Sequence, residues 1–238
     1  MAGHSKWANI KFRKSVQDAK RGKIFTKLIR EISVAARIGG ADESTNSRLR
    51  DVVSKALKAN MKRDTIDNAI KRGAGGLEGA NMIEMRYEGY GPAGVAILVD
   101  CLSDNKNRTV SEVRHCFTKH GGNLGTDGSV AYMFNKQGEI IVKPADKDYL
   151  IELAIELGVA DIVEDEEHVI LITTPDSYHI ILNGLIEKNI EVEHSQVAMR
   201  AANLTAVTED VSETLIKLID ALEDLDDVQE VYYNALLP

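Results

Sequence analysis

Residues 138–200 read GEIIVKPADKDYLIELAIELGVADIVEDEEHVILITTPDSYHIILNGLIEKNIEVEHSQVAMR, and the order of elements in this stretch decides the fold class. Four short runs rich in Ile and Val accompany two longer runs in which apolar residues recur at helical spacing. The pattern predicts strand, helix, strand, strand, helix and strand, which is the order of the ferredoxin-like split βαβ unit. We therefore expect residues 138–200 to form a compact α/β domain.

The segments on both sides of this stretch predict a second α/β domain. Strands and helices are expected over 82–88, 94–100, 110–120, 130–134, 204–207, 211–225 and 228–234. The first two form a hairpin, and Thr109 and Glu112 have the spacing of a capping box at the start of the first helix. Because the strands before residue 135 lack enough partners alone, we expect the C-terminal segment to complete their sheet.

The first 75 residues predict a small bundle of three helices. The first helix has an apolar face, and its opposite face carries Lys23, Lys27, Arg30 and Arg37. This helix is expected to end at Gly39-Gly40, and a second to start near Asn46 or Ser47. A third has Asp64 as its predicted N-cap, and the glycine-rich run at 73–79 then predicts a flexible linker.

Together these patterns predict an α+β protein with an N-terminal helical bundle followed by two α/β domains. One α/β domain is ferredoxin-like and inserted in the other. The expected divisions are 1–79 for the basic helical domain and its linker, 80–137 plus 201–238 for the first α/β domain, and 138–200 for the inserted one.

Charge is distributed unevenly along the chain. Residues 1–75 hold 18 Lys and Arg residues against 7 Asp and Glu residues, which is a net charge of +11. The remainder carries −19, so that the whole chain has a formal charge of −8. Such asymmetry indicates a basic binding module attached to an acidic body. Nucleic acid is the partner that most rewards this density of cations, because each neutralised phosphate releases counterions.

The candidate binding residues are basic, polar and aromatic side chains of the N-terminal segment. The polar groups are suited to hydrogen-bond phosphate or sugar, and Trp7 is placed either to stack on a base or to pack against the bundle. A solvated basic face is the alternative for the charges. The predicted nucleic-acid-binding set is Lys6, Trp7, Asn9, Lys11, Arg13, Lys14, Lys20, Arg21, Lys23, Lys27, Arg30 and Arg37.

Three other features carry weaker signals. The loop GGNLGTDGS at 121–129 offers backbone N–H groups for an anion, or is a long connection whose glycines permit positive φ. It matches neither the GxGxxG nor the Walker A pattern. The acidic clusters at 164–167 and 223–227 lack the spacing of a calcium loop, and the six histidines show no HxH or HExxH spacing.

These observations predict a protein without catalytic residues, metal site or cofactor, and no small-molecule substrate is indicated. No apolar run reaches the roughly 18–20 residues that span a bilayer. The N-terminus lacks the apolar stretch of a secretory signal. We expect a cytoplasmic protein that does not act at a membrane, in which Cys101 and Cys116 are buried thiols rather than a disulfide.

The same residues carry a resemblance to a known family. MAGHSKWANIKFRK at 1–14 and QDAKRGKIFTKLIREISVAAR at 17–37 resemble the opening of the YebC/PmpR family. GGNLGTDGSVAYMF at 121–134 and LIDALEDLDDVQEVYYN at 218–234 resemble its later blocks. Phe12 stands where the family usually has His, and Ala201-Ala202 where proline is common. The resemblance implies three domains, a helical one and two α/β domains arranged around a cleft, and a regulator of gene expression without catalytic residues.

Two functions follow as hypotheses. Bacterial members are described as transcriptional regulators that bind DNA, so the resemblance implies a non-enzymatic DNA-binding transcriptional regulatory protein. Mitochondrial relatives act as translational activators, which makes an RNA-binding translation factor on ribosomal RNA or the ribosome the alternative. A hydrolase that uses the acidic clusters with a metal is a third reading, and no motif supports it. No helix-turn-helix recognition helix is identified, and the basic segment suits structured RNA as well as DNA.

Overall fold

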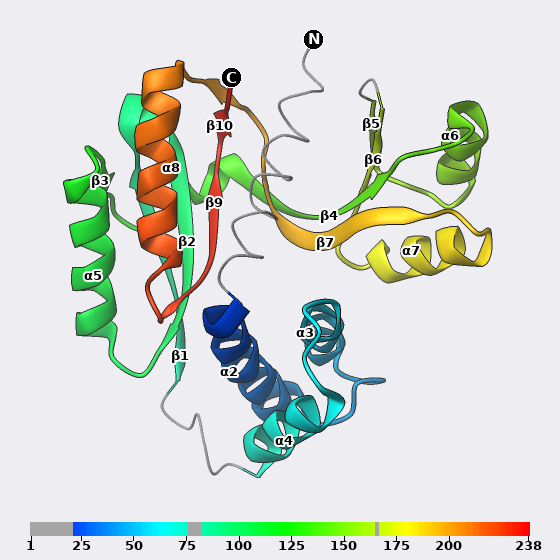
Figure 1. The fold of residues 1–238 in the computed structure, drawn as a ribbon, viewed down its shortest axis with the longest axis horizontal. Helices are drawn as coiled ribbons and strands as arrows, with labels where there is room; N and C mark the ends of the chain where they lie inside the picture. Colours follow the sequence, from blue (N-terminus) through cyan, green and yellow to red (C-terminus); the bar gives the residue numbers. More distant parts are fainter. Residues whose placement is uncertain (1–20, 76–81, 165–166) are drawn as a thin grey trace. The chain divides into compact units, whose positions relative to one another are not determined.

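The computed structural model describes residues 21–75, 82–164 and 167–238, and these fall into two compact units. One unit contains the described residues up to Val130 together with Glu209–Tyr233, and the other contains Ala131–Thr208 and Asn234–Pro238. Both units contain helices and a four-stranded antiparallel sheet, so the predicted α+β class is confirmed (Figure 1). The three-domain division at the predicted boundaries stays a prediction.

Three helices form the helical module, α2 (Arg21–Gly39), α3 (Ser47–Lys58) and α4 (Arg63–Ala74). Their apolar faces meet in one core that includes Ile32, Leu49 and Ile66, each with no exposed surface. α3 starts where the second helix was predicted to start, and Asn46 is its N-cap, because its Oδ1 accepts from the Leu49 N–H at 3.0 Å. Its Nδ2 donates to the carbonyls of Ala35 and Gly40, which ties the end of α2 to the start of α3.

Helices α2 and α4 cross at very close range. A Cβ added at Gly73 would lie 2.1 Å from the carbonyl oxygen of Ser33, so only glycine fits there. The Ser33 hydroxyl also donates to the Ala69 carbonyl at 3.1 Å. The predicted N-cap of α4, Asp64, is wrong, because Lys62 occupies that position and Asp64 lies in the first helical turn. A carboxylate there still favours the helix through its dipole.

The sheet of the same unit has the order β3-β1-β2-β9. The hairpin strands β1 (Ile83–Tyr90) and β2 (Ala96–Ser103) pair antiparallel, and β9 (Val228–Tyr233) pairs antiparallel with β2. The short β3 (Asn123–Leu124) pairs with β1. β9 comes from the C-terminal segment, so part of this segment completes the first sheet, whereas the residues up to Thr208 and from Asn234 onward belong to the other unit.

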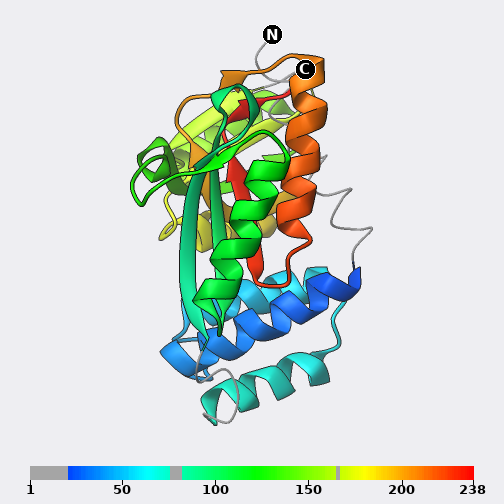
Figure 2. The ribbon, with the colours of Figure 1, turned by 90° about the vertical axis from the view of Figure 1, so that its left-hand side faces the viewer.

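Two helices, α5 (Lys106–Lys119) and α8 (Glu209–Glu223), lie side by side against this sheet (Figures 1 and 2). The predicted capping box at Thr109 is wrong, because α5 starts at Lys106 and Asn105 is its N-cap. The Asn105 Oδ1 accepts from the Arg108 N–H at 3.1 Å. Thr109 therefore lies inside the helix, where its hydroxyl donates to a buried carboxylate described below.

The other unit contains the predicted ferredoxin-like arrangement. Its elements are β4 (Phe134–Val142), α6 (Lys147–Glu156), β5 (Asp161–Glu164), β6 (Val169–Thr173), α7 (Tyr178–Glu187) and β7 (Val192–Ala201). The sheet order β5-β6-β4-β7, with every neighbouring pair antiparallel, is that of a split βαβ unit. Side chains of α6 and α7 share one core with Ile140 and Leu171 of the sheet.

Two details of this unit differ from the prediction. The expected separate strand at 130–134 is wrong, because Ala131–Met133 form a 3-10 turn and β4 then runs without interruption from Phe134. Near the C-terminus, β8 (Thr205–Ala206) pairs in parallel with β10 (Ala235–Leu236), which forms a separate two-stranded sheet. Among the described helices, none is long and apolar enough to cross a bilayer.

Candidate nucleic-acid interface

Seven of the predicted binding residues, Lys6, Trp7, Asn9, Lys11, Arg13, Lys14 and Lys20, lie outside the described residues. Arg21 is the first residue of α2. The remaining four, Lys23, Lys27, Arg30 and Arg37, are all on α2. Their contacts show what the basic face of this helix does within its own unit.

Three of these cations contact the acidic cluster at residues 223–227. We call residues 223–227, at the end of α8, the acidic turn, and Lys23, Lys27 and Arg30 the cation row. Lys23 Nζ donates to the Asp224 carbonyl at 2.9 Å, and Lys27 Nζ donates to the Glu223 carbonyl at 2.7 Å. Arg30 Nη1 donates to the Asp226 carbonyl at 2.9 Å and lies 3.5 Å from Asp227 Oδ1.

The geometry of this contact follows from helix electrostatics. The last carbonyls of a helix have no partner within the helix and carry a partial negative charge. Residues 23, 27 and 30 are spaced four and three positions apart, so they project from one side of α2. The cation row therefore satisfies the carbonyl of Glu223, the last residue of α8, and those of Asp224 and Asp226 just beyond it. Burial lowers the pKa of Lys27, although the carboxylates of Glu223, Glu230 and Asp224 act in the opposite direction.

A second set of charges joins the helical module to the sheet. Lys55 Nζ on α3 lies 3.3 Å from Glu230 Oε1 on β9, and Arg48 pairs with Glu84 on β1. The Glu230 carboxylate raises the pKa of Lys55 in spite of its burial, and burial raises the pKa of the neighbouring Glu31. Some of the basic residues of the helical module therefore pair with acidic residues of the sheet and hold the two parts of this unit together.

The fourth predicted residue, Arg37, lies near the end of α2. Its Nη2 donates to the Met82 carbonyl at 3.0 Å, just before β1. Its Nη1 is buried and has no hydrogen-bond partner among the described residues. Arg37 thus has an internal contact as well.

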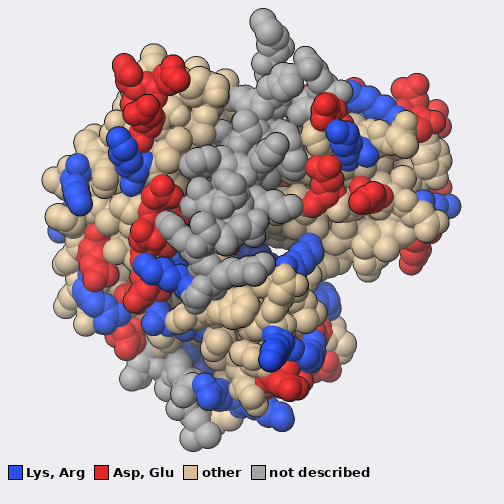
Figure 3. Space-filling view, in the orientation of Figure 1, with Lys and Arg blue, Asp and Glu red and all other residues tan. Residues whose placement is uncertain are grey.

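Basic side chains that remain exposed lie on the outer side of the helical module. They are Lys58, Lys62, Arg63, Lys71 and Arg72, at the end of α3 and along α4. Figure 3 shows Lys and Arg side chains over α3 and α4, in the lower part of the view, with acidic side chains between them. Arg63 pairs with Glu43 and with Asp67. These residues were not in the predicted set, although their density in residues 55–72 was a visible signal.

A buried carboxylate anchors the acidic turn to β2 and α5. Asp227 is 3% exposed, and its Oδ2 accepts from the hydroxyls of Ser103 and Thr109, both at 2.8 Å. Arg108 adds two further donors, Nη2 at 2.7 Å and Nε at 3.2 Å. Burial alone would raise the pKa of Asp227, but hydrogen bonds from Arg108, Ser103 and Thr109 outweigh it and lower the pKa. Sequence analysis missed this anchor because its donors come from distant segments.

The glycine-rich loop at 121–129 is folded around an internal carboxylate. Glu88 on β1 is 7% exposed, and its two oxygens accept from the N–H groups of Gly128 and Val130, both at 2.7 Å. The Gly125 N–H donates to the Glu88 carbonyl at 2.7 Å. One amide of this loop, that of Gly128, therefore already binds an anion that the chain supplies, and the Gly125 amide is satisfied by a backbone carbonyl.

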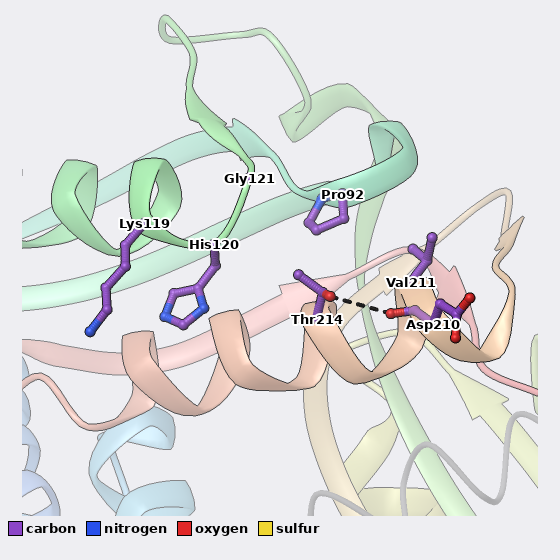
Figure 4. Close-up of a pocket in the computed structure, with 7 residues that line it drawn as sticks. All are labelled: Pro92, Lys119, His120, Gly121, Asp210, Val211 and Thr214. Carbon is purple, nitrogen blue, oxygen red and sulfur yellow. Dashed lines mark hydrogen bonds between the residues drawn. The ribbon is translucent and has the colours of Figure 1, made fainter.

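A shallow pocket of about 480 Å³ lies between the end of α5 and the start of α8 (Figure 4). Lys119, His120 and Gly121 line one side, and Asp210 and Thr214 line the other. The Thr214 hydroxyl donates to the Asp210 carbonyl at 3.2 Å. Burial and the nearby Lys119, Lys217 and His115 lower the pKa of His120, which leaves its imidazole neutral at neutral pH. The pocket pairs no nucleophile with a base.

The described residues contain no group of three or more His, Cys, Asp or Glu side chains arranged to hold a metal ion. Cys101 and Cys116 are both free and buried, so the prediction of buried thiols is confirmed. Burial, with Asp100 and Asp227 nearby, raises the pKa of Cys101 to about 12, which leaves it as an unreactive thiol.

Taken together, these features define an α+β protein. Within one of its compact units, ion pairs and hydrogen bonds from basic side chains hold the helical module against the sheet and the acidic turn. Comparison with known proteins then gives the family. A family profile described as the TACO1/YebC protein N-terminal domain matches residues 5–76. Another, described as the TACO1/YebC second and third domain, matches residues 82–235. The chain belongs to the TACO1/YebC family, which confirms the resemblance stated from the sequence.

Relatives match along almost the whole chain. A protein of Legionella pneumophila (strain Corby), named "Probable transcriptional regulatory protein", is 68% identical over 238 residues, covering 99% of this chain and 96% of the relative. One of Idiomarina loihiensis with the same description is 56% identical over 237 residues, covering 99% and 95%. The crystal structure of a conserved hypothetical protein from Aquifex aeolicus has a TM-score of 0.80 at 46% identity, covering 93% of this chain and 92% of that one.

Proposed function

We propose that this protein is a non-enzymatic, nucleic-acid-binding regulator of gene expression, acting on DNA as a transcriptional regulator. The observation that carries the proposal is the net charge of +11 in residues 1–75 of a chain with a net charge of −8. Nucleic acid rewards such a segment through counterion release. Relatives named as transcriptional regulatory proteins, with 56–68% identity over 99% of this chain, support the regulatory role.

The proposed binding surface has two parts. The first is the basic set predicted from the sequence, from Lys6 to Arg37. The second is the outer side of α3 and α4, where Lys58, Lys62, Lys71 and Arg72 are exposed. Contacts of these cations with phosphates would give affinity and fast association, but little discrimination between sequences.

The alternative is an RNA-binding translation factor that docks on ribosomal RNA. One observation favours it. The exposed side of α4, the third helix of the module, carries Asp64 and Asp67 one turn apart. Carboxylates at these positions disfavour insertion into a DNA major groove, whereas structured RNA is recognised largely by shape and backbone.

Crosslinking in living cells, followed by sequencing of the recovered nucleic acid, tests the proposal and separates its two forms. Recovery concentrated on promoter DNA would support the transcriptional form. Recovery concentrated on ribosomal RNA would replace it with the translational form. Recovery of neither, with efficient crosslinking of a known nucleic-acid-binding protein in the same cells, would contradict both.

Binding should depend steeply on salt, and the cation row should contribute to that dependence. Each phosphate contact on duplex DNA adds about 0.9 to the slope of log K against log salt. Replacing Lys23, Lys27 and Arg30 with alanine is therefore expected to reduce the magnitude of the slope by up to about 2.7. Fluorescence polarisation of a labelled DNA duplex over a salt series measures this slope.

The matched control removes three exposed lysines from the ferredoxin-like unit, with Lys136, Lys143 and Lys188 changed to alanine. Both triple variants lose the same charge, so a non-specific effect would change both slopes equally. An unchanged slope in the cation-row variant would mean that these side chains touch no phosphate.

A further inference from the structure

The acidic turn binds the cation row through oxygen acceptors, which is also how the phosphates of a nucleic-acid backbone would bind it. It presents three backbone carbonyls to Lys23, Lys27 and Arg30 at 2.7–2.9 Å. It adds the carboxylates of Asp224, 3.8 Å from Lys23 Nζ, and Asp227, 3.5 Å from Arg30 Nη1. Oxygen atoms with negative charge are thus already in place where phosphate oxygens would bind.

The acidic turn occupies one side of each cation, so a phosphate that used the same N–H donors would have to displace it. We infer that the acidic turn is an intramolecular competitor, which restricts access of a polyanion to the cation row until the turn is displaced. This inference rests on the proposed nucleic-acid binding. The apparent affinity of the cation row for the polyanion is then its intrinsic affinity multiplied by the fraction of molecules in which the contact is open.

The Lys23 end of the contact lies at the surface of the unit, whereas Lys27 is partly buried and the Asp227 side chain is only 4% exposed. The side chains of Lys23 and Asp224 are both 50% exposed, and that of Arg30 is 29% exposed. Ion pairs with this degree of exposure are weak and are screened further by salt. A polyanion that offers several phosphates at once can therefore compete with them.

The turn itself stays in place when the contact opens, because its anchor is elsewhere. Asp227 is held by Ser103, Thr109 and Arg108, on β2 and α5. The Leu102 N–H also donates to the Asp227 carbonyl at 2.8 Å. None of these donors belongs to α2. The acidic turn is thus a preformed surface on the sheet side, and α2 is the partner that is released.

Neutralising the turn without removing its carbonyls tests the inference. The test variant carries Glu223→Gln, Asp224→Asn and Asp226→Asn in the full-length protein. The matched control carries Glu209→Gln, Asp210→Asn and Glu213→Gln, which are exposed residues at the opposite end of α8. Each removes three negative charges. The control site is roughly 20 Å away along the helix, about two Debye lengths at 0.1 M salt.

The probes are a short fluorescein-labelled DNA duplex and a single-stranded RNA of the same sequence, followed by polarisation. The test variant is expected to bind at least one probe about tenfold more tightly than the unchanged protein, as a released competitor requires. The control should gain less than about threefold, because screening weakens its remote charges. Equal gains in both variants would overturn the inference and leave the proposed function standing. Absence of binding by every protein would overturn both.

A covalent readout checks the same competition without changing any charge. A carbodiimide condenses the Lys23 ammonium with the Asp224 carboxylate to an amide, with loss of water, and peptide mass spectrometry quantifies the product. Saturating probe is expected to reduce this crosslink several-fold. The Lys147–Glu164 pair of the ferredoxin-like unit, with 3.0 Å between Nζ and Oε2, is the internal reference. An unchanged Lys23–Asp224 yield with probe bound would overturn the inference.

Discussion

Replacing Asp227 with alanine is expected to lower the free energy of unfolding by about 3 kcal/mol, as for a broken buried ion pair. The carboxylate is 3% exposed and accepts four hydrogen bonds from Ser103, Thr109 and Arg108. Its removal leaves the buried Ser103 hydroxyl without its acceptor, whereas the Thr109 hydroxyl still has the Asn105 carbonyl at 2.9 Å. The Arg108 side chain is 45% exposed and can rehydrate, so the loss lies at the lower end of the usual range. Urea unfolding followed by circular dichroism measures it.

The adjacent residue provides the control. Asp226 is exposed and contributes its backbone carbonyl to the contact with Arg30, so Asp226→Ala should change the unfolding free energy by less than about 0.5 kcal/mol. Because two compact units need not unfold together, the transition of each should be followed separately. Equal losses in the two variants would contradict the anchoring role of Asp227.

The anchor also predicts a pH dependence. The pKa of Asp227 is lowered in the folded protein, where hydrogen bonds from Arg108, Ser103 and Thr109 outweigh the effect of burial. Such a carboxyl stabilises the fold at pH values above its unfolded pKa, about 3.9. This contribution is lost as the pH falls through the lower folded pKa. The stability difference between the unchanged protein and Asp227→Asn is therefore expected to shrink below about pH 4. Unfolding midpoints across a pH series measure it, and a constant difference would contradict the mechanism.

Replacing Glu88 with alanine is expected to cost about 3–4 kcal/mol, from two charge-assisted hydrogen bonds of roughly 1.5–3 kcal/mol each. The carboxylate binds the N–H groups of Gly128 and Val130, both at 2.7 Å, and Val130 has no exposed surface. In the variant, the buried Val130 N–H loses this acceptor. Hydrogen exchange should show loss of protection at Gly128 and Val130, together with a lower unfolding midpoint.

A second glutamate on the same strand is the matched control. Glu84 also lies on β1 but is exposed, and its pair with Arg48 is a surface ion pair. Glu84→Ala should therefore cost less than about 1 kcal/mol and leave exchange in the loop unchanged. If both variants had the same effect, the loop at 121–129 would not depend on the Glu88 carboxylate.

The candidate site was only partly predictable. Periodicity placed Lys23, Lys27 and Arg30 on one face of a helix, and the structure has them there. It could not indicate that the partner of this face would be residues 223–227, about 200 positions along the chain. Local sequence gives the sign of a charge and the direction of its side chain, whereas its partner depends on chain folding. The same applies to Glu88. Nothing in the local sequence distinguishes it from an exposed glutamate of a strand, and only the folded chain brings the Gly128 and Val130 amides to its carboxylate.

Helix starts could be predicted where the capping interaction is local, and could not where a distant residue takes part. The start of α3 near Asn46 or Ser47 was predicted correctly, and Asn46 caps this helix by accepting from a nearby amide, which is a local interaction. Thr109 was misplaced because its hydroxyl serves Asp227, which is distant in sequence, while Asn105 caps the helix. A capping motif in the sequence thus predicts the helix start only where its hydroxyl does not bind a residue distant in sequence.

The sequence by itself determined the α+β class, the split βαβ order and the segregation of charge, because these follow from periodicity and composition along the chain. Tertiary structure alone decided which charges meet. It placed the acidic turn on the cation row and buried Asp227 among Ser103, Thr109 and Arg108. The physical reason is that hydrophobic patterning is local, with periods of two or 3.6 residues. Electrostatic pairing depends instead on distances in space, which only the packed chain defines.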